Sequence, residues 1–126
     1  MKCLNCGEKA CHEARENHRY VVSGLTNVEL LDVPVRRCTK CGDTEVIIDR
    51  LPELHRAIAH VLVRKHSALA AEEFRFLRKH LGLSSTDLAR KIGVTLESIS
   101  RWESGRMAIH PAAERLLRLM VATSHP

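Results

Sequence analysis

The stretch that decides the fold of the C-terminal half is residues 81–107, LGLSSTDLARKIGVTLESISRWESGRM. Its apolar residues recur at helical spacing in two short segments that meet at Gly93. Ser84, followed three residues later by Asp87, is typical of a capped helix start, and Thr95 can cap a second helix in the same way. The stretch therefore predicts two short helices joined by a tight turn.

The second of these helices has two different faces. Ile99, Trp102 and Glu103 point one way, and the two large apolar residues predict that this face is buried. The opposite face is small and polar, and it comprises Glu97, Ser100, Arg101 and Ser104. Such a face fits the major groove of DNA, where arginine can bond guanine through two hydrogen bonds. The pattern predicts a helix-turn-helix, although an ordinary bundle of three or four helices is the plain alternative.

The charge of the chain is distributed unevenly. Residues 1–50 contain eight Lys/Arg and eight Asp/Glu, whereas residues 51–126 contain twelve and seven, which is a net charge of +5. The excess positive charge lies in the half with the helix-turn-helix, which favours a polyanionic partner for that half. No apolar run is long enough for a membrane span and no signal sequence is visible, so we expect a cytoplasmic protein.

Four of the five cysteines lie in two C-x-x-C-G turns, Cys3–Cys6 and Cys38–Cys41. Two such turns predict one structural zinc ion held by four thiolates, because two intervening residues let both sulfurs of a turn reach one ion. Iron remains open for an S₄ site. A redox C-x-x-C would need a βαβ setting that this sequence lacks. Cys11 and His12 lie outside both turns, and we interpret them as bystanders.

The remaining segments define an α+β fold of two domains. Residues 20–22, 28–35 and 45–48 are strand-like, so residues 1–66 are predicted to form a small zinc-bound sheet followed by a connecting helix. Residues 67–126 are predicted to be the helix-turn-helix domain. We expect the linker at 66–71 to be partly helical. The broad apolar stripe of the last helix suggests a dimer contact near Leu117 and Val121, or packing against residues 54–62.

Residues 72–120 resemble the DNA-binding domain of the Cro/phage-repressor (XRE) helix-turn-helix class, through the segments LRKHLGLS, DLARKIGVT and ISRWESG. Repressors of this class hold a buried arginine–glutamate pair at the positions of Arg78 and Glu103, so the resemblance implies one here. The predicted DNA contacts are Leu96, Glu97, Ser100 and Arg101 on the second helix, Ser85 on the preceding one, and Ser84 and Arg106 toward phosphates.

The whole chain is similar to the MqsA antitoxin family (YgiT-type zinc finger proteins), through CLNCG, DVPVRRCTKCGD, LRKHLGLS and ISRWESGRMAIHP. In that family a zinc domain neutralises a protein toxin, and the C-terminal domain forms a homodimer that represses its own operon at a palindrome of double-stranded DNA. The resemblance implies that Cys3, Cys6, Cys38 and Cys41 bind zinc and that Arg101 reads DNA. The best-known member has asparagine where this chain has Glu97, so its operator sequence does not carry over to this chain.

The leading prediction is an antitoxin and autorepressor. The first alternative is a stand-alone zinc-containing repressor without a toxin partner. An enzyme is disfavoured, because four cysteines leave a bound metal no open position and no catalytic Ser-His-Asp or carboxylate pair stands out.

Overall fold

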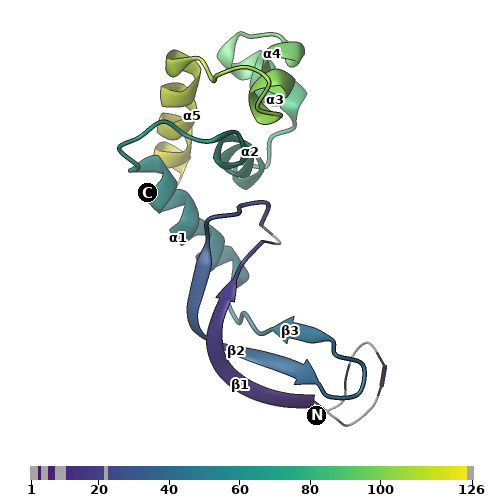
Figure 1. The fold of residues 1–126 in the computed structure, drawn as a ribbon. Coiled ribbons are helices and arrows are strands. Elements are labelled where there is room, and N and C mark those ends of the chain that lie inside the picture. Colours follow the sequence, from purple (N-terminus) through teal and green to yellow (C-terminus); the bar gives the residue numbers. More distant parts are fainter. Residues whose placement is uncertain (1–2, 4–5, 8–10, 22, 125–126) are drawn as a thin grey trace. The chain divides into compact units, whose positions relative to one another are not determined.

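The computed structural model of the protein describes residues 3, 6–7, 11–21 and 23–124. Its contacts divide the chain into two compact units, Met1–Leu51 (the N-terminal unit) and Pro52–Pro126 (the C-terminal unit). The first contains a three-stranded sheet and the second is helical (Figure 1). The predicted α+β fold with two domains is therefore confirmed.

The N-terminal unit is an antiparallel sheet of β1 (Cys11–Arg19), β2 (Glu29–Cys38) and β3 (Thr44–Val46), in this order. β1 and β2 pair along nearly their whole length, and a bulge interrupts the register between Glu16 and His18. The register sets Cys11 opposite Cys38 at the end of the hairpin where the cysteine turns lie.

One predicted strand is wrong and one strand was missed. Residues 20 and 21 have no regular structure, and Val22 lies outside the described residues. The first strand is instead CHEARENHR, which is β1. This segment carries charged and polar residues without a β-branched one, so its sequence gives no strand signal. It becomes a strand because β2 supplies a hydrogen-bonding partner along it.

Few apolar side chains of the N-terminal unit are buried. Among its described residues these are Tyr20, Leu25, Leu30 and Val35, together with the thiols of Cys3 and Cys38. A unit of this size with so few buried apolar groups gains little from the hydrophobic effect, which makes a metal a natural source of stability.

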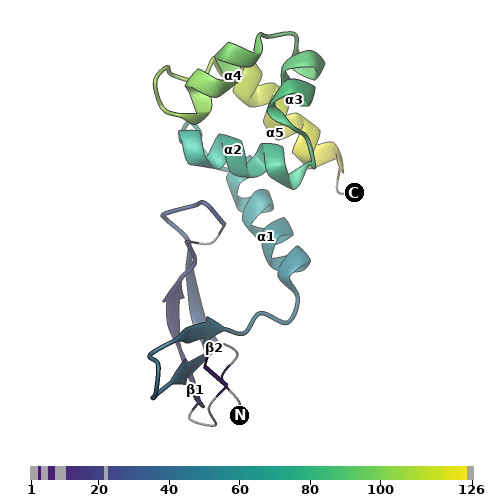
Figure 2. The ribbon, with the colours of Figure 1, turned by 90° about the vertical axis from the view of Figure 1, so that its right-hand side faces the viewer.

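The C-terminal unit contains five helices (Figure 2). They are α1 (Leu51–Val63), α2 (Ala71–His80), α3 (Ser85–Ile92), α4 (Leu96–Glu103) and α5 (Pro111–Ser124). The fully buried apolar side chains of α2–α5 are Phe74, Leu77, Leu88, Ile99 and Leu117. The rings of Phe74 and Trp102 meet edge to face at 5.9 Å, which fixes α2 against α4.

Helix α1 was grouped with the zinc domain in the sequence analysis, but its contacts place it in the C-terminal unit. Ala59 and Leu62 are its buried residues, and the ring of His55 meets Phe76 of α2 at 5.6 Å. Val61 of the same helix is 68% exposed.

The connection between α1 and α2 is not helical, contrary to expectation. It is held by Arg118 of α5, whose guanidinium donates hydrogen bonds to three carbonyl oxygens of this segment, those of Val63, Lys65 and Ser67. Arg118 also bonds the carboxylate of Glu114 at 2.6 Å, and that carboxylate accepts the backbone N–H of Leu69 at 2.9 Å. These bonds satisfy backbone groups that a helix would otherwise satisfy.

A second carboxylate anchors the same connection. Glu73 of α2 is buried and accepts hydrogen bonds from the ammonium of Lys65 at 2.6 Å and the backbone N–H of Ala70 at 2.7 Å. The segment is therefore tied to both α2 and α5, so α1 is part of the helical domain rather than a separate arm.

The apolar stripe of α5 is used within the chain. Leu117 and Val121, the proposed dimer contact, are 0% and 2% exposed, so they cannot be the surface that meets a second copy. Leu116 and Leu119 are the α5 residues that face solvent, at 38% and 58%. No helix among the described residues is long and apolar enough to cross a membrane.

Candidate metal centre and nucleic-acid interface

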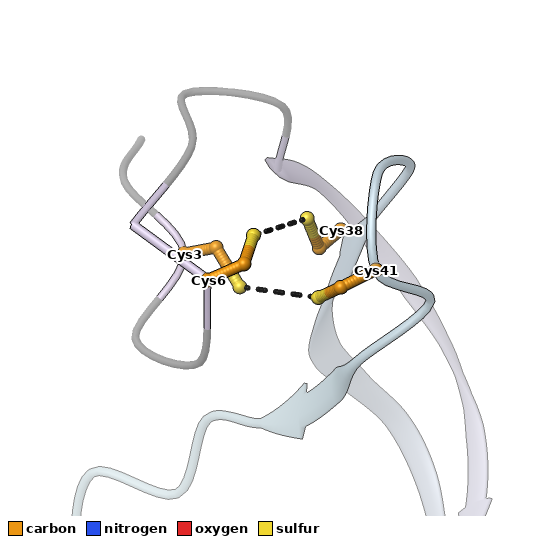
Figure 3. A group of neighbouring side chains, drawn as sticks. All are labelled: Cys3, Cys6, Cys38 and Cys41. Carbon is orange, nitrogen blue, oxygen red and sulfur yellow. Dashed lines mark hydrogen bonds between the residues drawn. The ribbon is translucent and has the colours of Figure 1, made fainter.

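The structure brings together the four cysteines of the two C-x-x-C turns (Figure 3). Their sulfur atoms all lie within 4.8 Å of one another. The Sγ atoms of Cys3 and Cys41 are 3.6 Å apart, and so are those of Cys6 and Cys38. Four thiols in this arrangement can hold one metal ion.

The two turns have matched backbone geometry. The backbone N–H of Gly7 donates to the carbonyl of Cys3 at 2.9 Å, and Gly42 donates to Cys38 at the same distance. Both glycines have φ of +77°, a left-handed conformation that side chains disfavour. This is the physical reason for a glycine directly after each second cysteine.

The electrostatics of the second turn favour a thiolate. Hydrogen bonds from the backbone N–H groups of Cys41 and Lys40, opposed by burial, lower the pKa of Cys38 to about 6. A metal ligand must be the thiolate, so this turn prepares Cys38 for coordination near neutral pH.

The spacing of the sulfurs fits a single ion. A tetrahedral zinc with Zn–S bonds of about 2.3 Å holds its sulfurs about 3.8 Å apart, close to the distances found here. Such a site has no vacant position for substrate, which suits a structural role. Iron fits the same donor set, so the geometry leaves the identity of the metal open.

The fifth cysteine lies beside this group without belonging to it. Cys11 is the register partner of Cys38 but is not one of the four clustered thiols. Burial, and then its neighbours Cys3 and Cys38, raise the pKa of Cys11, which keeps it a neutral thiol. His12 is exposed on β1 and joins no such group among the described residues.

The helix-turn-helix is formed by α3 and α4. Ser84 caps α3, since its hydroxyl accepts the backbone N–H of Asp87 at 3.0 Å while the Asp87 carboxylate accepts the N–H of Ser84 at 3.3 Å. Gly93 ends α3 in a left-handed conformation. Thr95 caps α4 by accepting the N–H of Ser98 at 3.2 Å. The start signals predicted from the sequence are therefore confirmed.

The orientation of α4 is fixed by the pair of Arg78 and Glu103. Two guanidinium nitrogens of Arg78 bond the two carboxylate oxygens of Glu103 at 2.7 and 2.9 Å, and a third donates to the carbonyl of Leu83 at 2.9 Å. Both side chains are about nine-tenths buried. A two-point bond of this kind fixes direction as well as distance, so α2 sets how α4 presents its outer face.

The outer face of α4 contains the residues predicted to contact DNA. Leu96, Glu97, Ser100 and Arg101 are all exposed. Glu97 and Arg101 stand one turn apart, yet the structure contains no ion pair between them. Ser84 is exposed and Ser85 half-buried at the start of α3, and Arg106 is exposed just beyond α4. The predicted residues thus come from the first turn of α3 and the outer side and end of α4.

Sequence reasoning missed the residues that hold the connection between α1 and α2. Glu114 and Arg118 form an ion pair at i, i+4 on α5, and Glu73 forms one with Lys65. The i, i+4 spacing was visible in the sequence, but a surface pair has the same spacing. Burial distinguishes the two cases, and only the structure gives it.

Comparison with known proteins agrees with the geometry of this region. Residues 74–123 match the helix-turn-helix family model. The uncharacterised HTH-type transcriptional regulator YiaG of Escherichia coli strain K12 is 37% identical over 57 residues, which is 45% of this chain and 59% of YiaG. YiaG of E. coli O6:H1 and of E. coli O157:H7 match to the same extent. The chain thus spans about three fifths of the length of these relatives.

Proposed function

We propose that the chain is a DNA-binding transcriptional regulator that reads an operator with α4. The observation that carries this proposal is the outer face of α4, where Glu97, Ser100 and Arg101 are exposed on a helix whose direction is fixed by a buried two-point ion pair. Small polar residues around one arginine suit the floor of a major groove. The match of this region to the helix-turn-helix model supports the same function.

The distribution of charge in the C-terminal unit also supports DNA binding. Three basic side chains, Arg78, Arg118 and Lys65, are paired with buried or half-buried carboxylates. The excess positive charge therefore lies on the surface, where it includes Arg101 and Arg106. Surface cations that are not neutralised by the protein can replace the counterions of DNA phosphates.

For the N-terminal unit we propose one structural zinc ion on Cys3, Cys6, Cys38 and Cys41. The close approach of four thiols and the depressed pKa of Cys38 support this assignment. In a reducing cytoplasm, where we expect the protein to act, thiols persist as ligands rather than disulfides. Metal analysis of the purified protein tests it: one equivalent of zinc is expected, and iron would change the assignment.

We further propose an antitoxin role, in which the zinc-bound unit binds a protein toxin and the C-terminal unit represses the operon. Its support is the similarity of the whole chain to the MqsA family in both the cysteine turns and the helix-turn-helix. A stand-alone repressor accounts equally well for the helix-turn-helix. Co-expression with the neighbouring gene separates the two, because an antitoxin copurifies with that gene product and relieves its toxicity.

A homodimer on palindromic DNA is part of the proposal. Leu116 on the exposed side of α5 borders a hollow of about 300 Å³ lined mainly by apolar side chains, including Ile92, Val94 and Trp102. A second copy covering this hollow would set two α4 helices to read two half-sites about 10 bp apart or a multiple of that distance. Sedimentation of wild type against Leu116→Glu tests this, since the variant should be monomeric.

Selection of binding sites from random duplexes, followed by footprinting on the protein's own promoter, tests the DNA-binding function. Arg101→Ala should weaken binding by about 1–3 kcal/mol per half-site and relax the preference at one base pair. Glu97→Gln is the matched variant on the same face. It removes a carboxylate that repels phosphates, so it should strengthen binding to random DNA. Equal loss on selected and random DNA for Arg101→Ala would show that Arg101 contacts phosphate only.

A further inference from the structure

The C-terminal unit has a second surface groove, at the other end of α5 from the recognition helix. The first turns of α5, with Ala112, Ala113 and Leu116, border a hollow shared with Trp102 of α4. Val121 and Ala122, near the last turn, border a groove shared with α1. Ten residues of helix separate the two ends, a distance of about 15 Å. The groove is lined by residues of α1, of its end and of α5, whereas the proposed DNA-reading face comes from α3 and α4, so the two surfaces are distinct.

The groove has an apolar floor of small side chains and a volume of about 240 Å³. Ala59 and Val121 are buried beneath it, and Val63 and Ala122 complete the apolar lining. Small residues on both facing helices leave a concave surface that aliphatic side chains can fill. A ligand that covers the accessible part of this lining, Val63 and Ala122, removes apolar surface from water.

The rim of the groove is basic. Arg56, His60 and Arg64 line it, and these three residues are exposed on successive turns along one face of α1 and its end, about 6 Å apart. Among the described residues that line the groove there is no Asp or Glu. The guanidinium groups of the two arginines take part in no hydrogen bond or ion pair within the part of the chain that the structure describes. The guanidinium groups of Arg56 and Arg64 beside an apolar floor are complementary to a ligand that carries both carboxylates and aliphatic side chains.

We propose that this groove docks an acidic segment of a protein partner, with aliphatic side chains against Val63 and Ala122 and carboxylates on Arg56 and Arg64. A protein segment is favoured over nucleic acid, because DNA offers its phosphates without a side chain to cover an apolar floor. It is favoured over the same groove of a second copy, which would bring the arginines of both copies together. The groove gives the regulator a protein contact that is separate from the cysteine cluster.

The test uses the full-length, metal-loaded protein and a fluorescein-labelled peptide of twelve residues that alternates glutamate with leucine or valine. Two control peptides carry glutamine for glutamate, or serine for the aliphatic residues. Fluorescence anisotropy should show saturable binding of the first peptide and at least about tenfold weaker binding of both controls, because the groove needs charge and apolar contact together.

Variants locate the binding site. Arg56→Glu with Arg64→Glu should weaken the peptide about tenfold or more, through lost attraction and new repulsion. The matched control is Arg75→Glu with Lys79→Glu, which reverses two exposed charges one turn apart on α2 and should change binding less than about twofold. Ala122→Phe fills the groove without a change of charge, and it should also weaken binding.

Three results would overturn the proposal. The wild-type protein does not bind the acidic peptide at millimolar concentration, or the two charge-reversed pairs weaken it equally, or the α1 pair weakens duplex DNA binding far more than the α2 pair does. The last result would make the groove part of the nucleic-acid surface. Fluorescence of Trp102 checks that each variant is folded, since this sole tryptophan is buried in the same unit.

Discussion

The two units of this chain are stabilised in different ways. The N-terminal unit buries few apolar side chains, and its two cysteine turns meet with four sulfur atoms that lie within 4.8 Å of one another. The C-terminal unit has an apolar core around Phe74 and Leu77 and adds ion pairs that are buried at its edge. A unit without a core can fold only if another interaction offsets the loss of chain entropy.

The largest expected effect follows from removing the proposed zinc ion. Chelation, or Cys3→Ser, should unfold the N-terminal unit completely, because structural zinc contributes on the order of 10 kcal/mol in small domains. The C-terminal unit should stay folded. Tyr20 and Trp102, the sole tyrosine and tryptophan of the chain, lie one in each unit and report on them separately by fluorescence and circular dichroism.

Cys11→Ser is the matched control for this experiment. It removes a thiol beside the cluster that is not one of the four grouped sulfurs, so zinc content and folding should be unchanged. Loss of Trp102 signal on chelation would show that the two units do not fold independently.

The second prediction concerns the buried pair that orients α4. Arg78→Met should destabilise the C-terminal unit by about 3–5 kcal/mol, because Glu103 is left charged, buried and without its partner. In a unit of this size that loss lowers the melting temperature by more than about 10 °C. Arg75→Met, an exposed arginine on the same helix, should change it little. An unchanged melting temperature for Arg78→Met would refute this role of the pair.

The third prediction separates the units by their electrostatic contribution to DNA binding. Arg106→Ala should weaken binding to all sequences and lower the slope of log K against log salt by about one, because one phosphate contact is lost. Arg19→Ala, an exposed arginine of β1, should leave the slope unchanged. Titrations at several salt concentrations measure both. Equal changes for the two variants would place DNA contacts on the N-terminal unit as well.

The smallest effect is expected at the cap of α3. Hydrogen bonds from Ser84 lower the pKa of Asp87, so its contribution to stability is present above the pKa of the unfolded chain and is lost as the pH falls through the lower, folded value. Asp87→Asn should therefore be slightly less stable than wild type at pH 7, and equal to it near pH 2. Melting curves followed by Trp102 measure this; a difference that persists at low pH would contradict it.

The C-terminal fold could be predicted because its signals are local. Ser84, Gly93 and Thr95 mark helix ends through contacts within four residues, so the chain sequence contains the whole interaction. The two cysteine turns are equally local. The two turns are more than thirty residues apart in the chain. That they meet could be predicted because one metal ion needs the thiolates of both.

The features that sequence reasoning missed depend on distant partners. Strand β1 forms through its pairing with β2, and its own residues do not favour a strand. Which side of α5 faces solvent depends on the position of α1, which lies beside Val121 in space but nearly sixty residues earlier in the chain. The same holds for Arg118, because the carbonyl groups that it reaches belong to a segment more than fifty residues earlier in the chain.

The bonds of Arg118 and Glu73 have a mechanical consequence. Because residues 63–70 are fastened to the helical domain, the chain between the sheet and that domain shortens to residues 47–50, which span at most about 13 Å when extended. A linker of this length gives each unit an effective concentration, relative to the other, in the millimolar range or above. If the N-terminal unit binds a protein and α4 binds DNA, as proposed, the two ligands meet at that effective concentration, so even a weak contact or clash between them changes DNA binding.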